Sequence, residues 1–149
     1  MQIIGFNLTK ISVEKSPDFK RSGINTSIEF TNIEKDKVDL LKDQEALKIN
    51  FKFSIIHGNN DQSSNPPKEE DIQGSALFEG SLMLAMEPEE AKAIQKSWKK
   101  KKVESNFQIP LYNFILRKCS PKAVALADDI GLPPHMPIPQ IKAQEKQAN

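Results

Sequence analysis

The spacing of hydrophobic residues changes at one point in the chain, near Glu87-Pro88. Before that point apolar and polar side chains alternate, which is typical of strands with one dry face. After it, apolar residues recur every three or four positions, which indicates helices. A chain that places its strands first and its helices after is predicted to form an α+β domain, here a four-stranded antiparallel sheet with helices packed on one face.

The four predicted strands differ in how clearly they alternate. The third is the clearest, and its apolar positions are Leu47, Ile49, Phe51, Phe53 and Ile55. Further strands are expected at 24–30 and 76–86. In the first strand the apolar parity changes between Leu8 and Ile11. Such a change predicts a β-bulge near Thr9-Lys10, because one extra residue keeps both apolar side chains on the same face.

Two helices are expected after the strands. Proline and acidic residues at 87–90 suit a helix N-terminus, and an apolar stripe follows at Ala91, Ile94 and Trp98. The second helix is predicted to begin near Pro110 and to end at Gly131. Ser120-Pro121 either kinks this helix or starts a fresh one. The interpretation is one domain over 1–141, followed by a disordered tail at 142–149 that has almost no apolar content.

Charge and cysteine content exclude several classes of protein. Lys plus Arg (21) nearly balances Asp plus Glu (20), so no general attraction to nucleic acid follows. No apolar run approaches the roughly 18 residues of a membrane span, and the N-terminal residues do not resemble a signal peptide. The single cysteine, Cys119, cannot form an internal disulfide. We therefore expect a cytoplasmic protein with no membrane insertion and no nucleic-acid partner.

The residues that usually carry catalysis are few and scattered. His57 and His135 are far apart in the sequence, and Cys119 lies on the apolar stripe of a helix, as a buried small hydrophobe would. The paired acids Glu69-Glu70 and Asp128-Asp129 are typical of solvated surface. No phosphate loop, nucleophile elbow or zinc motif is present. The hypothesis is a protein that is not an enzyme, with no catalytic residues, no metal and no cofactor.

Two features of the sequence are not explained by this interpretation. Lysines at 99–102 follow Trp98 and could contact RNA or acidic lipid, although a solvated helix end explains them better. Phe19, Trp98 and Tyr112 lie where a small domain does not need aromatic side chains. Together they are a weak indication of a binding groove.

Four short segments of the chain are similar to one family. These are the opening strand LTKISVEKSP at 8–17, the run ALFEG at 76–80, the helix start IPLY at 109–112, and the helix exit GLPPHMPIP at 131–139. In this order they resemble the SecB-type export chaperones, and the last segment is the most specific. The resemblance implies an ATP-independent holdase that binds unfolded polypeptides, among them preproteins for export, and that assembles as a homotetramer, a dimer of dimers.

The resemblance also implies where partners bind. The family groove follows the connection after the first strand, the second strand and the long helix, which assigns client binding here to Phe19, Ile28, Phe30 and Tyr112. Glu14 and Glu79 fall at acidic positions of the patch that docks the translocation motor. Other positions of that patch are not acidic here, and the tail does not resemble the family tail. The resemblance therefore supports motor docking less than it supports client binding.

A second hypothesis uses the same fold differently. The chain could be a dedicated adaptor or structural subunit that binds one protein partner, as SecB-like proteins that guard an antitoxin do. Suppression of aggregation across unrelated clients would favour the holdase, and capture of a single partner would favour the adaptor.

Overall fold

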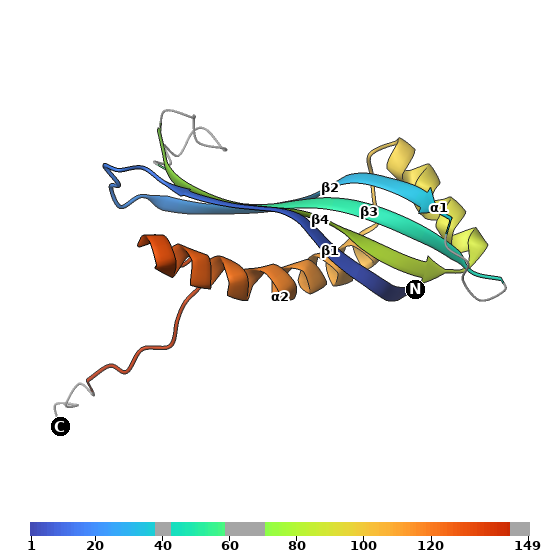
Figure 1. The fold of residues 1–149 in the computed structure, drawn as a ribbon. Helices are drawn as coiled ribbons and strands as arrows, with labels where there is room; N and C mark the ends of the chain where they lie inside the picture. Colours follow the sequence, from blue (N-terminus) through green and yellow to red (C-terminus); the bar gives the residue numbers. More distant parts are fainter. Residues whose placement is uncertain (38–42, 59–70, 144–149) are drawn as a thin grey trace, which may run out of the picture.

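The computed structural model describes residues 1–37, 43–58 and 71–143. Its strands form one antiparallel sheet in the order β1-β4-β3-β2, and two helices follow them in the chain (Figure 1). The elements are β1 (Gln2–Lys15), β2 (Gly23–Asp36), β3 (Glu45–Gly58), β4 (Ile72–Met86), α1 (Pro88–Lys99) and α2 (Ser105–Ile130). The predicted α+β fold with a four-stranded antiparallel sheet is confirmed. Residues 144–149 of the expected tail lie outside the described residues.

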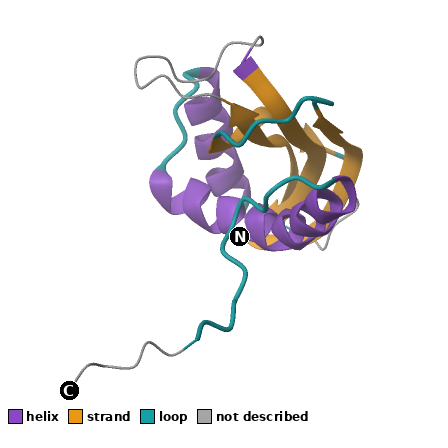
Figure 2. Ribbon diagram, turned by 90° about the vertical axis from the view of Figure 1, so that its left-hand side faces the viewer, coloured by secondary structure: helices purple, strands orange, loops and turns teal. Residues whose placement is uncertain are grey.

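The core lies between one face of the sheet and both helices. The alternate side chains of β3 from Leu47 to Ile55 are all buried, and they form one cluster with buried residues of α1 and α2. Because they share a parity, the two helices cover the same face. Figure 1 shows α2 running along the strands and α1 at the end of the sheet near the N-terminus. Figure 2 shows the curvature of the sheet around the helices. None of the described helices is long and apolar enough to span a membrane.

The β-bulge predicted in the first strand is present. The pairing of β1 with β4 shifts between Leu8 and Lys10, so that Ile11 lies opposite Phe78 on the helix-covered face. Gly80 of β4 lies at this place, and a Cβ there would collide with the carbonyl oxygen of Asn7. The bulge therefore depends on a glycine in the neighbouring strand.

The second helix begins earlier than the sequence indicated. α2 starts at Ser105, five residues before Pro110, and it continues without a break through Ser120-Pro121. The expected start was wrong because Phe107 extends the buried stripe by one turn and packs against Phe30, with ring centroids 6.3 Å apart. As expected, Gly131 ends the helix, in the left-handed conformation at φ 76°.

Candidate binding groove

The structure brings two of the four predicted client-binding residues into direct contact. The rings of Phe30 and Tyr112 meet edge to face, with centroids 4.9 Å apart. Ile28 lies on the same face of β2, half-buried against the core. Phe19 lies in the connection between β1 and β2 and contacts His57 instead, with ring centroids 6.2 Å apart. The predicted set therefore falls at two ends of the sheet.

Beside Phe30 and Tyr112 the surface is hollowed into two adjoining cavities of about 350 and 670 Å³. Trp98 lines both of them, and it was only a weak indication in the sequence. We call this surface the connector groove, because the connection between α1 and α2 forms one wall. It is lined by Glu29, Phe30, Thr31, Ile33, Lys92, Gln95, Lys96, Trp98, Lys99, Lys101, Val103, Gln108 and Tyr112.

Backbone and side-chain hydrogen bonds hold this wall in place. The Lys101 amide donates to the Trp98 carbonyl oxygen at 2.8 Å, and the Lys102 amide donates to the Ser97 carbonyl oxygen at 3.1 Å. Lys101 itself adopts the left-handed conformation at φ 52°, which is uncommon for a residue with a side chain. On α2, Gln108 Nε2 donates to the Tyr112 hydroxyl at 2.7 Å and orients that ring. These bonds set the path of the connection and the orientation of the Tyr112 ring.

The groove runs along an edge of the sheet. In the described residues β2 pairs with β3 alone, so one row of its backbone N–H and C=O groups faces outward. Phe30 and Ile33 come from this strand and line the groove. An extended chain that pairs with β2 would therefore place its alternate side chains at the groove.

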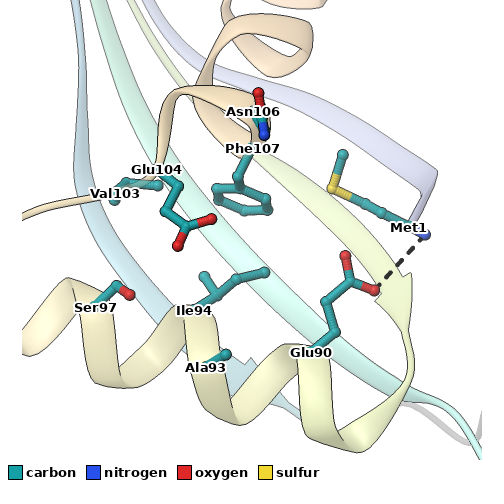
Figure 3. A pocket seen from close by; sticks show the side chains of 9 residues that line it. All are labelled: Met1, Glu90, Ala93, Ile94, Ser97, Val103, Glu104, Asn106 and Phe107. Carbon is teal, nitrogen blue, oxygen red and sulfur yellow. Dashed lines mark ion pairs between the residues drawn. The ribbon is translucent and has the colours of Figure 1, made fainter.

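The two sides of α1 carry opposite charges. Lys92, Lys96 and Lys99 line the connector groove. On the other side, Glu90 and Glu104 line a separate hollow of about 230 Å³ around Ile94 and Phe107 (Figure 3). There Glu90 forms an ion pair with the terminal amine of Met1 at 3.9 Å.

The two residues assigned to motor docking lie on the helix-free face of the sheet. Glu14 is opposite Ser75 in the pairing of β1 with β4. Glu79 lies in register between Lys10 and Lys52, and Lys52 is in turn opposite Glu29. The four charges alternate in sign across the sheet, and opposite charges in neighbouring strands stabilise the pairing. Glu79 is therefore flanked by a lysine in each neighbouring strand.

At the other end of the sheet the structure brings together two histidines that the sequence analysis kept apart. His57 is 3% exposed, and its Nδ1 has no hydrogen-bond partner among the described residues. His135 packs its ring on Phe53 at 6.1 Å, and its Nε2 lies 3.4 Å from Ser120 Oγ. Burial lowers the pKa of both histidines, and the nearby His135 lowers that of His57 further. Both rings are therefore kept neutral by their surroundings.

The cysteine has the environment of a core residue. Cys119 is fully buried, and burial raises the pKa of its thiol to about 11. Very little thiolate is present near neutral pH, so this group is a poor nucleophile. Within the described ranges, no group of three or more His, Cys, Asp or Glu side chains is placed to hold a metal ion.

Comparison with known proteins gives a likeness in structure and none in sequence. No protein-family model matches the chain, and no curated protein matches it. Among solved structures the chain is similar to a Mycobacterium tuberculosis SecB-like chaperone in complex with a ChAD peptide from the HigA1 antitoxin. The two chains are 16% identical, with a TM-score of 0.48, over 96% of this chain and 92% of that one. A likeness at this level does not say what this chain binds.

Proposed function

We propose that the protein binds extended segments of unfolded polypeptides in the connector groove. The observation that carries this proposal is the open edge of β2 beside a groove lined by Phe30, Trp98 and Tyr112. The backbone of a bound segment would pair with β2, and its apolar side chains would lie against the three aromatic rings.

The chemistry of this arrangement suits a holdase that needs no ATP. Backbone pairing is independent of sequence, so it accepts many clients, while aromatic hollows select for apolar side chains. Burial of apolar surface contributes roughly 25 cal/mol per Å², so a few seated side chains retain an unfolded segment. Binding of this kind uses no nucleophile, acid or base, and the protein acts without catalysis.

Phe30 and Ile28 have a supporting role in this proposal. Phe30 is only 7% exposed and contacts Phe107 as well as Tyr112, so it forms the floor of the groove more than its rim. Trp98 and Tyr112 are half-buried and present the surface that a client can reach. Phe19, at the far end, contributes to client binding only if a second site exists there.

The proposal includes a homo-oligomer, a dimer of dimers. β1 forms the other edge of the sheet, and Ile4 and Ile11 of this strand are 41% and 46% exposed. Pairing of β1 with a second copy would cover this edge. Native mass spectrometry at micromolar concentration should give a tetramer or a dimer, and a strictly monomeric mass would contradict this part.

The cellular setting is also proposed. A lone buried thiol suits a reducing compartment such as the cytoplasm. Delivery of preproteins to a translocation motor through Glu14 and Glu79 is a separate proposal, which a pull-down of the motor with Glu79→Lys and native protein would test.

The experiment for the main proposal uses several unrelated unfolded proteins. The protein should suppress the aggregation of each, and Trp98→Ala should weaken binding of a fluorescent unfolded client by about tenfold or more, as truncation of a central aromatic does. Met136→Ala is the matched control, because Met136 is 44% exposed but lies at the histidine end. Equal losses in both variants would contradict the groove. Action on one protein alone would favour a dedicated adaptor.

A further inference from the structure

The apolar part of the connector groove is surrounded by lysines. Lys92, Lys96 and Lys99 recur at helical spacing on α1 and line the same cavity as Ile33 and Trp98. Lys101 lines the adjoining cavity, where the left-handed turn places it. Four lysines therefore line the connector groove along the edge of β2.

The structure does not neutralise these lysines. The ion pairs of the described residues are Met1 with Glu90 and Lys35 with Glu45, and neither involves a groove lysine. Glu90 and Glu104 line the hollow on the opposite side of α1 (Figure 3), and the exposed Glu89, three residues before Lys92, forms no ion pair among the described residues. One carboxylate, Glu29, lines the cavity that contains Lys101. Four lysines and one acid therefore line the groove, which carries a net positive charge.

A solvated helix end explains only part of this pattern. Cations near the C-terminus of a helix interact favourably with its dipole, which accounts for Lys96, Lys99 and the lysines after them. Lys92 lies in the first half of α1, where the dipole gives no such benefit. It is also four residues before Lys96 and three residues after Glu89, so at helical spacing one neighbour repels it and the other attracts it. The helix dipole therefore does not account for Lys92.

We infer that the groove takes extended polypeptide segments in which acidic residues are interspersed among large apolar ones. This inference rests on the proposed function and names the class of segment. The apolar side chains lie against Ile33, Trp98 and Tyr112, and the Asp or Glu side chains approach Lys92, Lys96 and Lys101. Charge complementarity of this kind contributes to partner choice and to the rate of association.

A single-stranded nucleic acid is the other polyanion that a basic groove with a tryptophan can bind. The open edge of β2 favours the polypeptide, because its row of backbone donors and acceptors matches another extended chain. Nucleic-acid binding is therefore an outcome that the experiment must be able to detect.

The experiment uses three fluorescent peptides with identical apolar residues. The remaining positions carry Asp and Glu in the first peptide, Asn and Gln in the second, and Lys in the third. Anisotropy at low salt should show the acidic peptide binding about tenfold more tightly than the neutral one, and the lysine peptide binding most weakly. In about 0.5 M NaCl the three affinities should converge, because salt screens exposed charges.

Charge-reversal variants locate the effect. Lys92→Glu/Lys96→Glu should remove the preference for the acidic peptide, so that it binds no more tightly than the neutral one. The control is Lys118→Glu/Lys122→Glu, two exposed lysines at the same spacing on α2, which should change neither affinity. Circular dichroism checks the fold, and Lys92→Gln/Lys96→Gln replaces the reversal if it unfolds.

The outcomes separate the two proposals. Equal affinity for the acidic and neutral peptides overturns this inference and leaves the proposed function intact. Absence of binding by all three peptides overturns the proposed function. Tighter binding of a single-stranded oligonucleotide than of the acidic peptide, lost in Lys92→Glu/Lys96→Glu, overturns the inference in favour of nucleic acid.

Discussion

The two ends of the helix-covered face use aromatic side chains in opposite ways. At the groove end, Phe30 and Tyr112 meet beside an open hollow that Trp98 borders. At the histidine end, Phe19 and Phe53 contact His57 and His135. At the histidine end Phe53 is fully buried, whereas at the groove end Trp98 and Tyr112 are half-buried and line a hollow.

The cover at the histidine end is the segment that follows α2. Leu132 is 5% exposed and packs on Gly74, where a Cβ would lie 2.7 Å from its Cδ2 atom. His135 then lies over Phe53. No described segment lies over Trp98 and Tyr112 in this way. What covers an aromatic ring therefore decides whether a partner can reach it.

The largest effect expected is on stability, from Phe30→Ala. Phe30 packs against Phe107 and Tyr112 and is nearly buried, so its truncation should lower the free energy of unfolding by about 3–5 kcal/mol. Urea unfolding measures this. A decrease in the free energy of unfolding below about 1 kcal/mol would indicate that Phe30 belongs to the exposed rim of the groove and not to its floor.

Single truncations at the two ends should have opposite consequences. Tyr112→Ala should weaken client binding by about tenfold and lower stability little, because Tyr112 lies on the groove wall. Phe19→Ala should leave client affinity within about twofold but cost about 1–2 kcal/mol, because Phe19 packs on a buried histidine. Anisotropy measures the client affinity of each variant, and urea unfolding measures its free energy of unfolding.

The reverse pattern would contradict the placement of the client site at the groove end. If Phe19→Ala weakens binding while Tyr112→Ala does not, the client site lies at the histidine end. Tyr112→Phe is the control, since it keeps the ring and removes only the hydroxyl that accepts from Gln108.

The smallest effect expected is a pH dependence confined to the histidine end. The folded protein lowers the pKa of His57 and His135 below 6.5, so the unfolded chain binds more protons as the pH falls. Their contribution to stability is complete above pH 6.5 and is lost as the pH falls through the lowered values. The slope cannot exceed about 1.4 kcal/mol per pH unit per histidine.

Urea unfolding between pH 7.5 and 5 tests this dependence. His135→Gln should flatten it, because one titrating ring is removed. Client affinity for a neutral peptide should stay constant over the same range, since no histidine lines the connector groove. A pH dependence that His135→Gln leaves unchanged would assign it to other groups.

Periodicity predicted the sheet well because each strand buries one face. The alternation of β3 and the parity change in β1 are direct consequences of that burial, and both could be predicted from the sequence.

The start of α2 could not be predicted in this way. Pro110 suggested the first turn of the helix, whereas Phe107 is buried by contact with Phe30 from a distant strand.

The candidate site was only partly predictable for a similar reason. Phe30 and Tyr112 were chosen together and do meet, but Trp98 lines the groove only because α1 packs beside β2, an element far from it in the chain. The approach of His135 to His57 depends on the segment after α2, which brings His135 against Phe53. Local patterns of residues contain no signal for contacts of this kind, which join elements far apart in the chain.

The central claim is that a client adds to β2, and backbone hydrogen exchange tests it most directly. With an unfolded client peptide bound at saturation, the β2 amides that make no bond to β3 should exchange at least about tenfold more slowly than in the free protein. The amides of β1 and those of residues 132–138 should be unchanged by the peptide. Slower exchange in either of these regions, with none in β2, would contradict the account.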